Sequence, residues 1–344
     1  MGILPILIGW PLLIAAIVPL IKQERIRGYV VYAGAGGVMV LAAALLGMWL
    51  TNGAQAMAFY QETEWVNYLM IAGELFLTGL IVYLSIKYRK YPVILLSVGQ
   101  TALGIWTEFR FPMQPACHMQ IDSLSMLMCM IAAFIGGLIC IYAVGYMKAY
   151  HQHHKEFQDR SGFFFSMLFL FLAAMFGLVL SENLIWMYFF WEVTSVISFL
   201  LIGYTRTEEA VNNSFRALWM NLLGGLGFAV AIWLCALNRH SVQLSDVIDS
   251  GNQFIIACLA LAGLTKSAQL PFSTWLYGAM VAPTPSSALL HSATMVKAGV
   301  YLLIRLSPAL YGKMCIRDRY IVKDSSSGHY NIPFPFYQPL ITVG

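Results

Sequence analysis

Charged residues are scarce in this sequence. Of its 344 residues, 10% are Asp, Glu, Lys or Arg and 59% are hydrophobic, whereas about a quarter of the residues in soluble domains are charged. A soluble core does not account for so few charges. The composition therefore points to a protein that lies in a lipid bilayer.

Cofactor motifs are missing as well. The six cysteines include no CxxC pair and no Cys/His spacing typical of metal ligands, and the chain has no GxGxxG run and no phosphate loop. His151, His153 and His154 fall in one loop, which we expect to be solvated because a metal site needs three or four converging ligands. We expect no metal, no cofactor and no redox centre in this chain.

Apolar stretches of about 20 residues recur along nearly the whole chain, and each is long enough to cross about 30 Å of hydrocarbon as a helix. We predict an all-α polytopic transmembrane helix bundle with about ten crossings. The first stretch reads as a retained helix, because it lacks the basic start and the cleavage site of a signal peptide. The expected crossings are residues 3–21, 29–50, 67–86, 91–107, 121–147, 162–180, 183–204, 215–237, 252–282 and 286–306.

Basic residues favour alternate loops of this topology. The opposite loops hold only Arg110 and Arg239. Because Lys and Arg accumulate on the cytoplasmic side, we expect a cell inner (cytoplasmic) membrane protein with its N-terminus outside. The net charge of +4 then reflects topology and does not indicate nucleic-acid binding. The favoured loops hold Lys22, Arg25, Arg27, Lys87, Arg89, Lys90, Lys148, Lys155, Arg160, Arg206 and Arg216.

Four charged residues fall inside the expected membrane helices, namely Glu74, Glu192, Lys266 and Lys297. Each costs about 2.5–3.5 kcal/mol at mid-membrane, so four unpaired charges would cost about 10–14 kcal/mol, more than the net stability of many proteins. A carboxyl group and a lysine that face each other inside a bundle control each other's protonation. Glu192 and Lys266 are therefore candidates for proton transfer, with a static structural ion pair as the alternative. Glu74 has no obvious basic partner nearby in sequence.

Two breaks are expected near these charges. Pro271 follows Lys266 by five residues and should break the helix at 252–282; broken helices at membrane depth mark ion sites in transporters. The break should leave Lys266 beside free backbone groups and the amide of Gln269. In the next helix His291, Thr294 and Lys297 recur at steps of three, and we expect them to form a polar stripe.

Four linked motifs resemble the antiporter-like subunits of respiratory complex I. The same family includes the large subunit of multisubunit sodium/proton antiporters and membrane subunits of energy-converting nickel–iron hydrogenases. The resemblance runs from about Ile121 to about Leu306, and Thr194-Ser195 is more similar to the antiporter and hydrogenase branches. The motifs are Trp191-Glu192-Val193-Thr194-Ser195 with Phe199 to Tyr204, Lys266 to Pro271, Ala282 to Pro285, and His291 to Leu302.

The resemblance implies a proton relay through Glu192, Lys266, His291 and Lys297. It implies a proton-translocating subunit of a redox-driven complex of the hydrogenase or NADH-quinone oxidoreductase type, with other membrane subunits and peripheral redox subunits as partners. The alternatives are a subunit of a sodium/proton antiporter and a non-conducting membrane scaffold. Asp122 matches a family position too, although a helix N-cap explains it equally well.

The chain divides into three expected parts. Residues 1–115 form N-terminal membrane helices, residues 116–311 form an incomplete proton-conducting bundle, and residues 312–344 are an unstructured tail. The tail brings basic residues to the outer side and contains Lys313-Met314-Cys315-Ile316-Arg317-Asp318-Arg319, a run typical of fragmentary gene predictions. We expect an assembly artefact fused to a truncated gene, with a genuine extracellular tail as the alternative.

Overall fold

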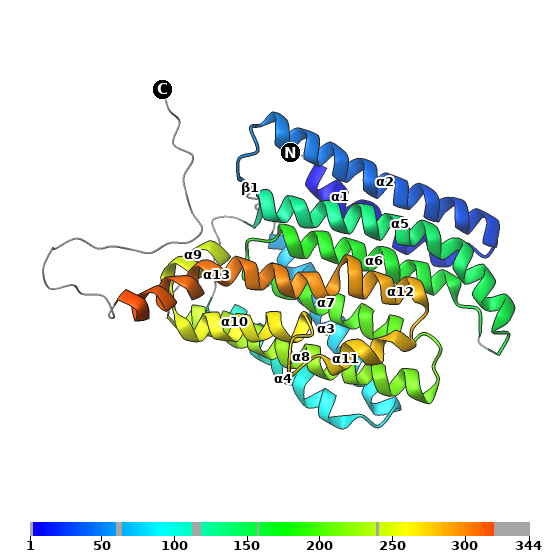
Figure 1. Cartoon of the computed structure of the whole chain (residues 1–344). Coiled ribbons are helices and arrows are strands. Elements are labelled where there is room, and N and C mark those ends of the chain that lie inside the picture. The colour runs from blue at the N-terminus through cyan, green and yellow to red at the C-terminus, as the bar shows by residue number, and fades with distance from the viewer. Residues whose placement is uncertain (1–2, 60–63, 112–117, 157, 239–240, 320–344) are drawn as a thin grey trace, which may run out of the picture.

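Long helices lying side by side make up nearly all of the structure (Figure 1). The computed structural model describes residues 3–59, 64–111, 118–156, 158–238 and 241–319. The long helices are α1 (Ile3–Ile17), α2 (Glu24–Thr51), α3 (Glu64–Lys87), α4 (Tyr91–Arg110), α5 (Ser123–His153), α6 (Ser161–Leu180), α7 (Leu184–Ile202), α8 (Glu208–Leu237), α10 (Gln253–Lys266) and α13 (Met295–Arg319). The short elements are η1 (Val18–Leu20), β1 (Met57–Phe59), β2 (Met119–Ile121), α9 (Leu244–Ser250), α11 (Thr274–Gly278), η2 (Ala279–Val281), α12 (Thr284–Ala288) and η3 (Leu289–Ala293). The predicted all-α bundle is confirmed.

Helix α6 lies at the centre of the bundle. It packs against α1, α5, α7 and α13, and 83% of its apolar window is buried, against 17% for α3. Nearly every position of α6 is apolar, as expected for a helix buried on all sides. Helix α3 lies instead at the edge, packed on α4 and α7.

Eight helices of the described residues are long and apolar enough to span a membrane, which matches eight of the ten expected crossings. The other two also exist as helices. Helix α4 is 20 residues long but carries Gln100, Thr101 and Glu108, so its hydropathy is lower. The crossing expected at 252–282 begins as α10, which has only 14 residues.

The four basic loops lie at one end of the bundle. Lys90 Nζ donates a hydrogen bond of 2.9 Å to Asn212 Oδ1, and the Arg160 guanidinium donates one to the carbonyl of Tyr204. The loop before α2 shares a pocket with the end of α5 and the start of α6. The alternation of loop charge thus reflects the real arrangement of the helices.

The opposite end is closed by short strand pairings. Strands β1 and β2 pair antiparallel, with Met57 opposite Ile121, and isolated bridges join Met119 to Ser181 and Asn183 to Gln243. Arg239 of the sparsely charged loops lies outside the described residues. So do residues 320–344, for which the expectation of an unstructured tail stays a prediction. Residues 312–319, expected to belong to that tail, instead form the last part of α13.

Helical structure is interrupted twice beside the expected site. The first break comes earlier than the proline predicts: α10 ends at Lys266 itself, and the residues that follow turn back before α11 begins. The second comes at Pro283, after which α12 starts. The helix expected at 286–306 is also interrupted, because residues 289–293 form a π-helical turn and Thr294 leaves helical geometry, with φ of −143° and ψ of −71°.

Candidate functional site

The ammonium group of Lys266 is the centre of the candidate site. Lys266 is fully buried, and its Nζ donates hydrogen bonds to Trp191 O at 2.7 Å, Thr194 Oγ1 at 2.7 Å and Ser195 Oγ at 2.9 Å. It also lies 4.6 Å from the centroid of the Trp191 ring. An ammonium has three N–H donors, so all three are satisfied by one turn of α7.

The end of α10 is fixed in place by a tryptophan from the next short helix. The indole Nε1 of Trp275, a fully buried residue of α11, donates to the carbonyl of Thr265 at 3.0 Å. The end of α10 thereby gains a side-chain donor for a carbonyl of its last turn, which also accepts from the backbone N–H of Ala268. Lys266 stands at the C-terminal end of the helix, where the helix dipole favours a positive charge.

Glu192 lies on the same turn of α7 but does not contact the lysine directly. The two groups interact electrostatically, yet within the described chain no ion pair of 4.0 Å or less joins them. Glu192 is buried, and its Oε1 makes no hydrogen bond to any described residue. The expected face-to-face pair is therefore not a direct contact: two hydroxyl groups and a backbone carbonyl hold Lys266, and the nearby carboxylate has a hydrogen bond with the Gln100 side chain.

A glycine makes room for that carboxylate. A Cβ atom on Gly225 of α8 would lie 2.3 Å from Glu192 Oε1 and 3.0 Å from Gln100 Oε1. Both distances are shorter than normal contacts allow. Helices α4, α7 and α8 therefore meet at Gly225 with two polar side chains between them.

Glu74 reaches the same region from α3. It interacts electrostatically with Glu192, and both carboxylates act on the phenol of Tyr188. Glu74 Oε1 lies 3.5 Å from the position of a Cβ on Gly104 of α4, with the Tyr188 ring also near that position. The structure thus brings the two acids together through Tyr188, which the sequence did not indicate.

Buried polar atoms without protein partners concentrate around these residues. Buried polar groups are ordinarily hydrogen-bonded, either to protein or to water. Six oxygen atoms of this kind on α3, α4, α7 and α8 form what we call the polar band; Ser85 Oγ, Trp191 Nε1 and Trp233 Nε1 on the same helices also lack a partner in the described chain. Its unpartnered atoms, among the described residues, are Glu74 Oε1, Ser97 Oγ, Gln100 Oε1, Tyr188 OH, Glu192 Oε1 and Asn221 Oδ1.

The predicted polar stripe is not formed. His291 lies in the π-helical turn, whereas Lys297 lies on α13. Between them Thr294 is turned inward, and its hydroxyl donates to the carbonyl of Leu289 at 2.7 Å. A step of three describes one face only in a continuous helix, and the interruption at Thr294 removes that condition. His291 Nε2 is buried without a hydrogen-bond partner in the described chain.

Two further candidate residues, Asp122 and Gln269, do not take part in the site around Lys266. Asp122 caps α5 in a capping box with Ser125 and forms an ion pair with Arg305 of α13 at 2.6 Å. Gln269 is exposed and does not accompany Lys266 as expected. Asp122 thus joins two helices at the bundle end opposite the basic loops.

Metal-binding geometry does not occur in the described part of the chain, where no group of three His, Cys, Asp or Glu residues is placed to hold an ion. His151 Nε2 lies 3.1 Å from Tyr204 OH and 3.4 Å from Asp159, so it serves contacts between loops. Cys129 and Cys140 are free and buried in α5.

Sequence reasoning missed the residues that surround the two charges. Thr194 and Ser195 belong to a quoted motif, but nothing in the sequence alone marks them as lysine ligands. Tyr188 precedes Glu192 by one helical turn, and that spacing was the available signal. Gln100 comes from a distant helix, and only the packing of α4 on α8 brings it in.

Comparisons with known proteins match two parts of this chain to families of membrane proteins. Residues 181–322 match the family described as "NADH:quinone oxidoreductase/Mrp antiporter, TM". Residues 106–157 match the family described as "NADH-Ubiquinone oxidoreductase (complex I), chain 5 N-terminus". Together the two matches support an antiporter-like membrane subunit of the complex I type.

Individual relatives are named as antiporter subunits. The chain is 40% identical over 197 residues to the Na(+)/H(+) antiporter A1 subunit of Staphylococcus haemolyticus, and 39% identical to the protein of the same name from Staphylococcus aureus. Each match covers 55% of this chain and 24% of the relative, so the chain spans about a quarter of their length. A chain in the "Structure of Mrp complex from Dietzia sp. DQ12-45-1b" matches with a TM-score of 0.50 and 28% identity, over 71% of this chain and 28% of that one.

Proposed function

We propose that this chain carries protons through the membrane as part of the large membrane subunit of a multisubunit sodium/proton antiporter. The observation that carries the proposal is the fully buried Lys266, held by three oxygen atoms of α7 beside the buried carboxyl group of Glu192. Such intramembrane ionisable groups are costly and ordinarily functional.

The ligands of Lys266 suit a group that gains and loses a proton. A hydroxyl group both donates and accepts hydrogen bonds, so Thr194 and Ser195 can bind the ammonium form as acceptors and the neutral amine as donors. A carboxylate partner held at ion-pair distance would favour the charged form alone. The arrangement therefore supports a relay over a static structural pair.

The polar band provides the approach to the lysine. Its unpartnered oxygen atoms need water molecules as hydrogen-bond partners, and such water could carry protons. These atoms extend from Glu74 past Tyr188 to Glu192. Beyond Lys266, helix α10 packs on α13, which carries Lys297. We assign His291 and Lys297 to the continuation of the path.

The sodium/proton antiporter is preferred to the redox-driven pump for one reason. The named relatives at about 40% identity are sodium/proton antiporter subunits. The redox-driven reading remains the second candidate because the matched family description also includes NADH:quinone oxidoreductase. Both readings place the chain in the cytoplasmic membrane with its basic loops inside, following the distribution of Lys and Arg.

Reconstitution of the parent complex in liposomes tests the proposal. A sodium gradient without any electron donor should move protons, read from an internal pH dye. We expect Lys266→Ala and Glu192→Ala each to abolish this flux while the complex still assembles. Lys87→Ala, at an exposed position of a basic loop, is the control. Flux that survives both changes would overturn the relay, and flux that requires an electron donor would favour the redox-driven reading.

A further inference from the structure

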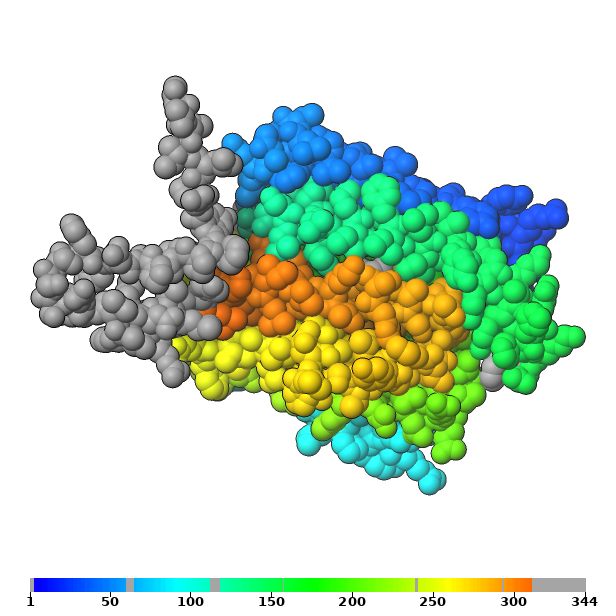
Figure 2. Space-filling model, in the orientation of Figure 1, coloured from blue at the N-terminus to red at the C-terminus, as the bar shows by residue number. Residues whose placement is uncertain are grey.

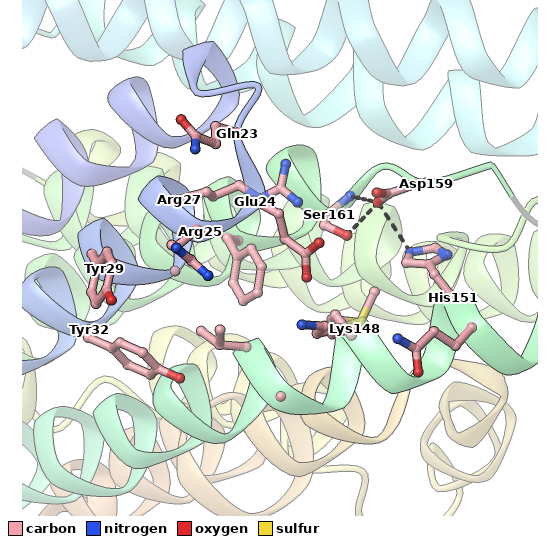
Figure 3. A pocket seen from close by; sticks show the side chains of 16 residues that line it. Gln23, Glu24, Arg25, Arg27, Tyr29, Tyr32, Lys148, His151, Asp159 and Ser161 are labelled. Atoms are coloured by element: carbon pink, nitrogen blue, oxygen red, sulfur yellow. Dashed lines mark hydrogen bonds and ion pairs between the residues drawn. The ribbon is translucent and has the colours of Figure 1, made fainter.

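A pocket of about 710 Å³ opens at the basic end of the bundle, away from the polar band. It lies between the start of α2, the last turns of α5 and the start of α6. Figure 3 shows the side chains that line it, including three cations: Arg25, Arg27 and Lys148. We call it the basic pocket.

The acidic residues in the basic pocket do not neutralise it. Asp159 accepts hydrogen bonds from the backbone N–H and the hydroxyl of Ser161 and lies 3.4 Å from His151 Nε2 (Figure 3). Burial acts to raise the pKa of Asp159, but the two Ser161 hydrogen bonds and the nearby His151 and Arg27 lower it below the usual value, so this carboxylate is charged and already engaged. Glu24 remains as the one other acid of the lining. Three cations against the two carboxylates of Asp159 and Glu24 leave a net positive charge in the lining.

Two features add hydrogen-bond donors to that charge. Helix α2 is 28 residues long and begins in the pocket, and its N-cap Gln23 makes no side-chain capping bond. The first backbone N–H groups and the positive end of the helix dipole therefore face an anion-binding position. In addition, Arg27 Nε is buried and has no hydrogen-bond partner in the described chain.

The surface that continues from the basic pocket is apolar. Tyr29 and Tyr32 line the pocket and are 66% and 43% exposed, and tyrosines are common at the headgroup level of membranes. Further along the same helix Val40 is 68% exposed, and on α5 Leu138 and Tyr142 are each 58% exposed. Helices α2 and α5 lie next to each other at the surface (Figure 2). A cationic pocket above an apolar face matches a molecule with an anionic head and apolar chains.

We propose that the basic pocket binds the headgroup of an anionic phospholipid, with the acyl chains along the outward faces of α2 and α5. The phosphate is placed by Arg25, Arg27 and Lys148 together with the N-terminus of α2. Basic pockets between membrane helices on the cytoplasmic side are a known means of recognising acidic lipids. Bound there, the lipid would join the α1–α2 pair to the rest of the bundle at α5 and α6.

Native mass spectrometry of the detergent-purified chain tests the proposal with three probes of known chemistry. These are phosphatidylglycerol, phosphatidylcholine with the same acyl chains, and free glycerol 3-phosphate. We expect phosphatidylglycerol to bind at least tenfold more tightly than either of the others. Equal binding of the two lipids would overturn the proposal, and binding of glycerol 3-phosphate as tight as that of the lipid would identify a site for soluble phosphate compounds instead.

Matched variants locate the binding. The combined change Arg25→Gln, Arg27→Gln and Lys148→Gln should weaken phosphatidylglycerol binding at least tenfold. The combined change Lys87→Gln, Arg89→Gln and Lys155→Gln removes the same charge from basic positions outside the pocket lining and should leave binding unchanged. Equal loss in both would show general attraction to basic loops and refute the pocket.

Single substitutions guard against misfolding. Lys148 and Lys155 are both exposed, so neither change should unfold the chain. One cation near a membrane surface is worth about 1 kcal/mol, which is about fivefold in affinity. We therefore expect Lys148→Gln to weaken phosphatidylglycerol binding about fivefold and Lys155→Gln to have no effect. Equal affinities of the two single variants would refute the assignment of Lys148.

Discussion

Substitution of Ser195 tests how Lys266 is held. The hydroxyl of Ser195 accepts one of the three hydrogen bonds from Lys266 Nζ, at 2.9 Å. Hydrogen bonds to charged groups contribute about 1.5–3 kcal/mol. Ser195→Ala should raise the free energy of the charged state of Lys266 by that amount, which lowers its population about 10- to 150-fold relative to the neutral state. If the charged lysine is an intermediate in transport, proton flux should fall within the same range.

Ser198 provides a closely matched control for this experiment. Both serines lie on α7, both are 1% exposed, and both hydroxyls donate to a backbone carbonyl, that of Trp191 for Ser195 and that of Ser195 for Ser198. Only Ser195 contacts Lys266. We expect Ser198→Ala to keep nearly full flux in proteoliposomes that contain the parent complex. Equal effects of the two substitutions, or less than a twofold loss for Ser195→Ala, would refute the reasoning.

Three other perturbations give expected outcomes. Gly225→Ala should destabilise the protein by about 1–3 kcal/mol through overpacking and reduce proton flux. Gly99→Ala is the control and should do neither, because a Cβ there has nothing within 4 Å. Thermal unfolding and flux assays compare the two variants. Asp122→Asn should cost about 1–3 kcal/mol, between the values for exposed and buried pairs, because it removes the carboxylate that forms the ion pair with the part-buried Arg305. Glu182 lies between α6 and α7, and burial raises its pKa above the usual value, so the folded state binds more protons than the unfolded state just above pH 4.5 and stability falls as pH rises through this window. Substitution of Glu182 by Gln should remove that fall, seen as a melting temperature gain over the wild type that grows as the pH is raised above 4.5.

The helix bundle could be predicted from the sequence because each membrane helix is determined by its own apolar stretch. Long apolar stretches must form helices in a membrane, and the alternation of basic loops correctly placed their ends on two sides. The sequence was less reliable at the breaks. Pro271 predicted an interruption, but the helix ends five residues earlier at Lys266, where Trp275 donates a hydrogen bond to the carbonyl of Thr265. That contact forms only because α11 folds back against the end of α10, and no local sequence pattern predicts this arrangement.

Prediction of the site succeeded for single charges and failed for their partners. The cost of burying Glu192 and Lys266 identified both from sequence, and both are buried in one place. The stripe from His291 to Lys297 was wrong because it assumed a regular helix, whereas residues 289–293 form a π-helical turn that packs against α5. Gln100 was missed because it lies on a helix distant in sequence and meets Glu192 only once α4, α7 and α8 pack around Gly225.

The indirect contact between Glu192 and Lys266 leads to a last prediction about stability. Removing one partner of a directly paired buried ion pair usually costs about 3–5 kcal/mol, because the other charge is left uncompensated. Here Lys266 keeps its three oxygen ligands when the carboxylate is neutralised, and the C-terminal end of α10 still favours its charge.

We therefore expect Glu192→Gln to abolish proton flux while lowering stability by less than about 1 kcal/mol, near the range of a weak ion pair. Flux in proteoliposomes measures the loss of proton transport, and thermal unfolding of the purified protein measures the change in stability. Lys266→Met is the opposite case, because it leaves a carboxylate that already lacks a hydrogen bond at Oε1 without its nearest cation. If Glu192→Gln instead destabilises the protein as strongly as a broken buried ion pair, the carboxylate and the lysine are in direct contact in the membrane, and hydroxyl groups are not what holds Lys266.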